Sequence, residues 1–174
     1  MMIQSICRCS AAAMLLFFGL ASPGQAEDPV FRAGASRLDA TPEHLPAVVN
    51  GSMLERLVEE VNDPLHVRAV VMDDGTTRIA MVLVDSCMMP RELLDKAKEM
   101  AEAQTGIPAE NILISATHCH SAPSVIAVLG TGVDERYVLF LPGRIAKAIV
   151  QCLGAHEPST LHQPSSAFRR PATT

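Results

Sequence analysis

The order strand, helix, strand between residues 78 and 117 constrains the fold more than any other feature of the chain. R-I-A-M-V-L-V-D (Arg78 to Asp85) and Asn111 to Thr117 are apolar runs of strand length, and the unbroken apolar character of the first predicts burial on both faces. Between them Pro90 starts a helix, Arg91 to Gln104, that Gly106 is suited to cap. Such a crossover is right-handed and makes the strands parallel neighbours. We therefore predict an α/β fold with a mixed β-sheet flanked by helices.

The segments before this unit fit the same sheet. Leu65 to Met72 reads as a strand, and the Asp-Gly pair within Asp73 to Thr77 predicts a hairpin turn that leads into the next strand. Phe31 to Pro42 alternates loosely and predicts an edge strand followed by a loop. Met53 to Val61 has apolar residues at helical spacing, which predicts a short helix.

A second helical stretch begins at Asp134-Glu135, and Pro142-Gly143 is expected to kink or divide it. After Gly154 the periodicity stops, and residues 155–174 end in Pro, Ser and Thr. We predict that this end is a disordered or non-homologous tail. One domain, residues 27–154, would precede it.

Residues 1–26 carry a sparse positive start, the apolar run A-A-A-M-L-L-F-F-G-L-A and a small-residue end at Gly24 to Ala26. These are the parts of a secretory signal peptide, and the run is too short to span a bilayer as a helix. We expect cleavage after Ala26 and an exported protein, periplasmic or secreted, with no transmembrane segment after signal removal. The formal net charge of −5 and the 3% content of aromatic residues argue against nucleic acid as a partner.

The motif S-A-T-H-C-H-S-A-P, Ser115 to Pro123, follows the last predicted strand. On an extended chain His118 and His120 point to the same face, and neutral imidazole pairs suit Zn²⁺. The alternative is that two polar residues simply cap a strand. Asp85 ends the neighbouring strand at the same sheet edge, where ligand sites of α/β sheets occur. Asp85 either orients a histidine or caps the following loop.

The chain has five cysteines, and Cys7 and Cys9 would leave with the signal peptide. The three that remain cannot form a complete disulfide framework. Cys119, between the two histidines, is a candidate soft metal ligand or nucleophile. Because strand geometry turns its side chain away from the histidines, we predict that Cys119 is a buried structural thiol.

Four stretches together resemble the N-terminal part of the catalytic domain in the neutral/alkaline non-lysosomal ceramidase family. They are A-G-A-S-R-L-D-A-T-P, D-P-L-H-V-R-A-V-V-M-D-D-G, I-A-M-V-L-V-D-S-C-M-M-P-R-E-L-L-D and I-P-A-E-N-I-L-I-S-A-T-H-C-H-S-A-P. The resemblance covers roughly Phe31 to Gly154. The family's motif reads T-H-T-H-S-G-P, so Cys119 stands for its middle Thr and Ala122 for its Gly.

The resemblance implies a zinc-dependent hydrolase that cleaves the amide bond of N-acyl sphingolipids, or a related lipid amide, with metal-activated water. It implies that His118 is a metal ligand and that His120 lines the site beside the single zinc ion. From its position at the end of the neighbouring strand, Asp85 is a candidate catalytic partner that orients a histidine, or it caps the following loop. The family's other zinc ligands lie further downstream, so the chain is expected to be an incomplete portion of a larger layered catalytic domain, with impaired activity.

Two alternatives stay open. The first is a non-catalytic exported metal-binding module, in which Cys119, the histidines and Met88-Met89 would suit copper. The second is an inactive fold remnant without metal. The oligomeric state is not predicted.

Overall fold

The computed structural model describes residues 30–155 and 157–158. The predicted signal peptide and nearly all of the predicted tail lie outside these residues. The described part contains two helices, one 3₁₀ turn and seven strands. In chain order they are β1 (Arg32–Asp39), β2 (Ala47–Val49), β3 (Arg56–Val58), β4 (His66–Asp73), β5 (Arg78–Val84), α1 (Arg91–Thr105), the 3₁₀ turn Ala109–Asn111, β6 (Ile112–Ala116), α2 (Glu135–Gly154) and β7 (Glu157–Pro158).

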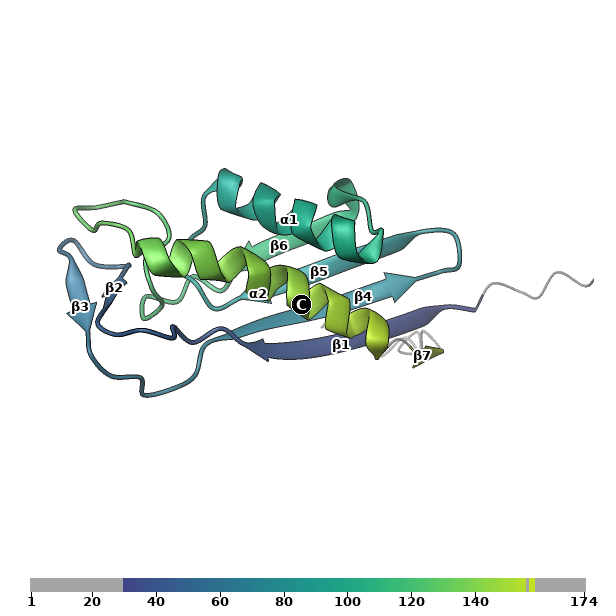
Figure 1. Ribbon diagram of the computed structural model, residues 1–174, viewed down its shortest axis with the longest axis horizontal. Helices are drawn as coiled ribbons and strands as arrows, with labels where there is room; N and C mark the ends of the chain where they lie inside the picture. The colour runs from purple at the N-terminus through teal and green to yellow at the C-terminus, as the bar shows by residue number, and fades with distance from the viewer. Residues whose placement is uncertain (1–29, 156, 159–174) are drawn as a thin grey trace, which may run out of the picture.

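A five-stranded mixed sheet in the order β6-β5-β4-β1-β7 organises the molecule, as Figure 1 shows. β5 and β6 pair in parallel with α1 as their crossover, and the other pairs of the sheet are antiparallel. The predicted α/β fold with a mixed sheet and flanking helices is thus confirmed. β1 lies near one edge, since its second neighbour β7 pairs with it only at Arg32 and Ala33.

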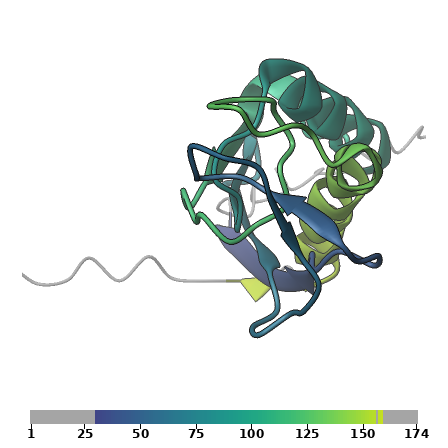
Figure 2. The ribbon, with the colours of Figure 1, turned by 90° about the vertical axis from the view of Figure 1, so that its left-hand side faces the viewer.

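Both helices cover the same face of the sheet, which is clearest in the end-on view of Figure 2. Alternate residues of β4, β5 and β6 are buried beneath them and join the core cluster with residues such as Leu141 and Ile145 of α2. The intervening residues point the other way, and Met81 and Leu83 of β5 are 47% and 41% exposed. The prediction that β5 is buried on both faces is therefore wrong, because helices cover only one face.

The two helices follow the predicted boundaries closely, with one correction. Gly106 ends α1 in a left-handed conformation with φ 71°, and its N–H donates to the carbonyl of Glu102. α2 begins where Asp134 accepts a hydrogen bond from the N–H of Tyr137. Of the kink or division expected at Pro142, the division is wrong, because α2 continues through this residue. Burial of its apolar face on both sides of Pro142 outweighs the cost of about 3 kcal/mol that an interior proline brings.

By length and composition α2 is the one helix in the described residues that could cross a membrane. Its apolar face packs against α1 and the sheet, with Leu141, Ile145 and Ile149 fully buried, so α2 is the core helix of this fold.

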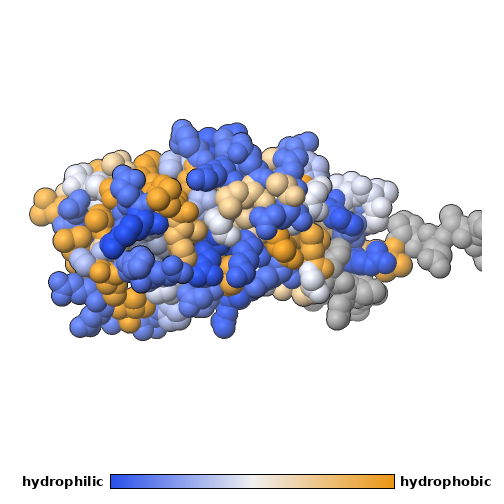
Figure 3. Space-filling view, in the orientation of Figure 1, coloured by the Kyte–Doolittle hydropathy of each residue, from blue (hydrophilic) through white to orange (hydrophobic). Residues whose placement is uncertain are grey.

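The region predicted as a short helix, residues 53–61, is instead part of a two-stranded ribbon. β3 pairs antiparallel with β2, so that Val48 lies opposite Leu57. Met53, Leu54 and Leu57 stay exposed at this end of the molecule, where apolar residues gather in Figure 3. The helical periodicity failed here because a helix needs a core to cover, and these apolar residues face solvent.

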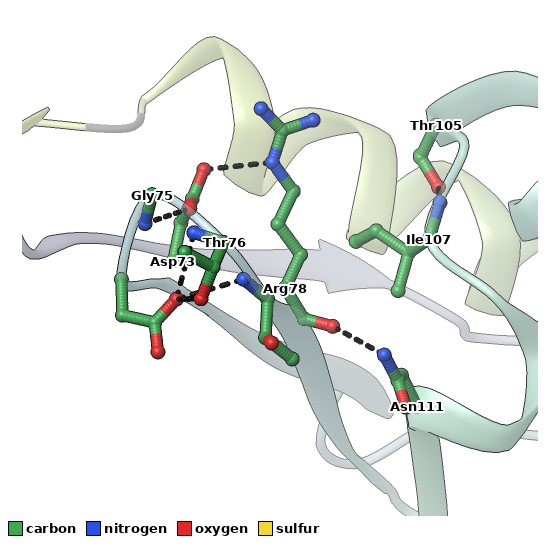
Figure 4. A network of polar contacts seen from close by, with 9 residues as sticks. Asp73, Gly75, Thr76, Arg78, Thr105, Ile107 and Asn111 are labelled. Atoms are coloured by element: carbon green, nitrogen blue, oxygen red, sulfur yellow. Dashed lines mark hydrogen bonds and ion pairs between the residues drawn. The ribbon is translucent and has the colours of Figure 1, made fainter. Parts of the chain in front are cut away.

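At the opposite end, the predicted hairpin joins β4 to β5 and is held by a closed set of polar contacts (Figure 4). The Asp73 carboxylate accepts hydrogen bonds from the N–H of Gly75 at 2.7 Å and from Nε of Arg78 at 2.7 Å. Asn111 donates to the carbonyl of Arg78, which ties the hairpin to the start of β6.

Candidate metal centre

The candidate site lies where β5 and β6 end side by side. Backbone hydrogen bonds continue past both strands, from the N–H of Thr117 to Val84 at 2.9 Å and from the N–H of Cys119 to Ser86 at 3.2 Å. These bonds hold the segment after β6 against the segment after β5. As a result the side chains of Cys87 and His118 become neighbours.

Three side chains converge at this point: Cys87, His118 and His120. Their ligand atoms all lie within 4.8 Å of one another, and the two imidazole rings meet edge to face with centroids 4.9 Å apart. Sulfur and imidazole nitrogen are the ligands that Zn²⁺ and similar ions prefer. The donor set therefore fits a metal ion.

The histidines come together by a different route from the one expected. β6 ends at Ala116, and His118 has a left-handed backbone with φ 63°, so the alternation of an extended chain does not apply to it. A non-glycine residue in this region costs about 1–3 kcal/mol and persists only where its surroundings require it. Such strained residues cluster at functional sites, which supports a role for the His118 side chain.

His118 is held in one tautomer by a backbone carbonyl. Its Nδ1 lies 2.8 Å from the carbonyl oxygen of Cys87, and because a carbonyl only accepts, Nδ1 is the protonated nitrogen. The lone pair of a neutral ring then resides on Nε2. Metal-binding histidines commonly donate their second nitrogen in this way, which fixes the ring and raises its basicity.

Cys87 is the site residue that sequence reasoning missed. Its side chain is buried, and its Sγ lies 3.9 Å from Nδ1 of His118. Burial, with a smaller contribution from Cys119, raises the pKa of the Cys87 thiol above its usual value. Its position two residues after Asp85, at the same sheet edge as His118, was the available signal.

The β2–β3 ribbon and its connecting loop contact both the ring and the backbone of His120. Gly51 has φ 97°, and a Cβ at this position would overlap the His120 ring. Nη2 of Arg56 donates to the carbonyl of His120 at 2.8 Å. The ring and the backbone of His120 are thus both positioned by the β2–β3 ribbon.

Buried polar groups lock the rest of the motif loop. The Ser124 hydroxyl is fully buried and bonds to the carbonyl of Gly132 at 2.7 Å, and the N–H of Ser124 donates to Val48 at 2.7 Å. Asp134 caps α2 with one carboxylate oxygen and accepts from the N–H of Val48 with the other. The motif, the ribbon and α2 therefore share one hydrogen-bonded frame.

Cys119 is half-buried and does not belong to the convergent group. It lines a cavity of about 490 Å³ between the ribbon and the sheet, so the prediction of a buried structural thiol is wrong. β6 ends at Ala116, before Cys119, and the Cys119 side chain does not pack into the core. The other lining residues are Thr41, Pro42, Leu45, Val49, Arg56, Val58, Glu60, Val61, Asn62, Asp63, Pro64, Leu65, Asp85, Ser121 and Pro123.

Asp85 also lines this cavity, but its partners are not the motif histidines. Its carboxylate accepts from Nη1 of Arg68 at 2.8 Å and from the backbone N–H of His66 at 2.9 Å, and Nδ1 of His66 lies 3.9 Å away. Burial opposes ionisation of Asp85, but these hydrogen bonds and the charges of Arg68 and His66 outweigh it and lower its pKa. Both carboxylate oxygens of Asp85 are therefore occupied, one by Arg68 and the other by the backbone N–H of His66.

Comparison with known proteins agrees with the fold. No protein-family model matches the chain, and no curated protein matches it significantly. Among solved structures, neutral ceramidase from Pseudomonas aeruginosa superposes with a TM-score of 0.66 at 22% identity, over 76% of this chain and 23% of that one. A ceramidase complexed with C2 superposes with a TM-score of 0.64 at 24% identity, over 75% of this chain and 22% of that one.

The chain has the fold of part of a neutral ceramidase. It spans less than a quarter of the length of these two structures. The likeness in structure and the earlier resemblance in motifs agree on the same family. At this level of identity the likeness establishes the fold, and the chemistry has to be argued from the site.

Proposed function

We propose that the chain is a zinc-dependent hydrolase of the neutral ceramidase type, acting on the amide bond of an N-acyl sphingolipid or a related lipid amide. The observation that carries this proposal is the convergence of Cys87, His118 and His120 within a fold shared with neutral ceramidases. The two ceramidases are more than four times as long as the matched part, so the activity is a proposal for this chain.

Each predicted site residue has a role in this proposal that its contacts support. His118 would hold the zinc ion, because its Nδ1–H is bonded to a carbonyl and its second nitrogen is free to coordinate. His120, held by Gly51 and Arg56 against His118, would stabilise charge or move a proton at the reacting carbonyl. A bound zinc ion supplies Lewis acidity and lowers the pKa of water to about 7.

The cavity beside the motif suits an amphiphilic amide. Its wall combines apolar side chains such as Leu45, Val58 and Val61 with the charged groups of Arg56 and Asp85. An acyl chain could lie on the apolar part while its amide lies near Cys119 and Ser121, which are the motif residues nearest the histidines that line the cavity. In this arrangement Asp85 acts as a positioning group that keeps Arg68 and His66 in place.

Hydrolysis of a fluorescent N-acylsphingosine by the zinc-loaded full chain tests this proposal. We expect zinc-dependent release of the fatty acid that is lost in His118→Ala and kept in His44→Ala, which changes an exposed histidine outside the centre. Absence of turnover from folded, zinc-loaded protein would contradict the proposed activity.

A non-catalytic metal-binding module is the second candidate, and the thiol in the convergent group favours it. Tight metal binding together with inert behaviour toward lipid amides would support this candidate over the hydrolase. A preference for Cu⁺ over Zn²⁺ would strengthen it further, because thiolate ligands favour Cu⁺.

We also propose export by cleavage after Ala26 and a domain that ends near residue 154. The described residues start at Val30, so the leader is supported by its sequence alone. Past residue 154, the described pair Glu157–Pro158 forms β7 against β1. The intact mass of the protein recovered from an exporting host tests the cleavage site.

A further inference from the structure

We propose that Asn50 is a positioning residue for His120, because its side-chain amide fixes the Gly51 backbone against which the His120 ring rests. The inference rests on the part that the proposed function gives to His120. It assigns the placement of the ring to a residue outside the histidine motif. Asn50 follows β2 directly, so this contact joins the ribbon to the segment after β6.

The Asn50 amide is buried and fully paired. The residue is 2% exposed. Its Oδ1 accepts from the N–H of Gly51 at 2.6 Å, and its Nδ2 donates to the carbonyl of Ile126 at 3.1 Å and to the Ser124 hydroxyl at 3.3 Å. Because an N–H only donates and a carbonyl only accepts, this orientation of the amide is the one that pairs both Gly51 and Ile126. The amide therefore fixes the Gly51 backbone relative to the loop that follows the motif.

The Gly51 backbone is in direct contact with the His120 ring. A Cβ at this position would overlap the ring, so the ring approaches closer than another residue type would allow. Gly51 has φ 97°, a conformation that glycine adopts readily. The N–H of Asn50 also donates to the carbonyl of Ala122, two residues after His120, at 3.4 Å. Asn50 thus holds both the surface on which the ring rests and the backbone close to it.

The position of Asn50 separates its effect on the chemical step from an effect on substrate binding. Among the described residues, those that line the cavity include Val49 and Arg56 but not Asn50. Loss of the Asn50 amide should therefore change kcat more than KM. Asn111, at the opposite end of the sheet, offers a matched comparison. Its side chain also donates to a backbone carbonyl, that of Arg78 at 3.0 Å.

Nuclear magnetic resonance of the full chain tests the proposal. The wild type should show a nuclear Overhauser effect between the Gly51 Hα atoms and the His120 ring. In Asn50→Ala the His120 ring resonances should shift while those of His44 stay in place, and Asn111→Ala should leave them unchanged. In hydrolysis of N-acylsphingosine, Asn50→Ala should lower kcat about 10- to 100-fold, because a misplaced catalytic group slows the chemical step.

The wild-type measurement can overturn the inference whether or not Asn50→Ala folds, because absence of the Overhauser effect would contradict the contact. Unshifted His120 resonances in folded Asn50→Ala, or an equal shift in Asn111→Ala, would also contradict it. Shifted His120 resonances with no amide hydrolysis by the wild type would support the positioning and refute the proposed activity. Hydrolysis by Asn50→Ala with the kcat of the wild type would support the activity and overturn the inference.

Discussion

The two ends of the sheet contain similar groups of polar side chains, but only one end pairs them fully. At the β4–β5 hairpin, the carboxylate of Asp73 accepts hydrogen bonds from the N–H of Gly75 and from Arg78 (Figure 4). The carboxylate of Asp74 accepts from the N–H of Thr77. At the other end, Cys87 and His118 converge with His120, and no described carboxylate belongs to that group. Polar groups that satisfy one another stabilise a fold, whereas convergent lone pairs are satisfied by a metal ion.

Asp85 lies at the end of the sheet that carries the candidate site, but its carboxylate is fully paired, as the carboxylates of the hairpin are. Its two oxygens are occupied by Arg68 and by the backbone of His66. Asp85 and Cys87 both follow β5. Asp85 binds groups of the sheet, whereas the Cys87 side chain faces His118. Proximity to the edge therefore does not by itself make a ligand, and the partners of each side chain decide its role.

The largest expected effect is on metal affinity when a central ligand is removed. His118→Ala should weaken Zn²⁺ binding by more than about 100-fold, since outer-shell changes alone cost about 10–100-fold. Competition with a chromophoric chelator measures this. His44→Ala is the matched control and should bind as the wild type does. Equal Zn²⁺ affinity in His118→Ala and the wild type would mean that the histidine end of the sheet is not a metal site.

The support behind His120 gives a second prediction. Gly51→Ala should reduce Zn²⁺ affinity about 10-fold, because the new Cβ would displace the His120 ring, and a left-handed alanine should destabilise the fold by about 1–2 kcal/mol. Gly106→Ala has the same kind of strain with φ 71° but no atom within 4 Å of the added Cβ. It should lose similar stability and keep the metal affinity, which chemical denaturation and chelator competition would show. Unchanged affinity in Gly51→Ala would mean that the position of the His120 ring does not affect metal binding.

For Asp85 the expected effect is on stability and not on metal affinity. Asp85→Asn should destabilise the fold by about 1–2 kcal/mol, because Arg68 and the His66 N–H lose a charged acceptor that is only 16% exposed. Asp95→Asn breaks an ion pair whose carboxylate is 45% exposed and should cost about 0–0.5 kcal/mol. Urea denaturation measures both. A drop of 10-fold or more in Zn²⁺ affinity for Asp85→Asn would instead make it a partner of the metal site.

The smallest effect is expected in the hairpin turn. Hydrogen bonds from the Thr77 N–H and from Thr76 lower the pKa of Asp74 below its ordinary value of 3.8. A lowered pKa means that the carboxylate stabilises the fold above pH 3.8 and that this contribution disappears as pH falls through the lowered value. Asp74→Ala should therefore lower Tm slightly at neutral pH and not in strong acid. A Tm difference that does not change with pH would contradict a role for the charge.

Much of this fold could be predicted from local patterns. The crossover from β5 through α1 to β6 follows from strand-length apolar runs around an amphipathic helix, and Asp-Gly specified the hairpin. What failed depended on tertiary packing. The spacing in residues 53–61 matched a helix, but no core lay behind it, and β5 was apolar on both faces although helices cover only one.

The candidate site was predictable to the extent that it lay in one motif. His118 and His120 were visible as a spaced pair, and Asp85 as a polar strand end. Cys87 joins them only through the backbone pairing of two loops, and the support from Gly51 comes from a ribbon far away in sequence. Neither contact has a signature in local spacing.

The most direct test of the central claim is X-ray absorption spectroscopy of the zinc-loaded full chain. A zinc ion held by His118 predicts imidazole scattering at about 2.0 Å from zinc. This scattering should weaken in His118→Ala and remain in His44→Ala. A wild-type spectrum without imidazole scattering would contradict the claim.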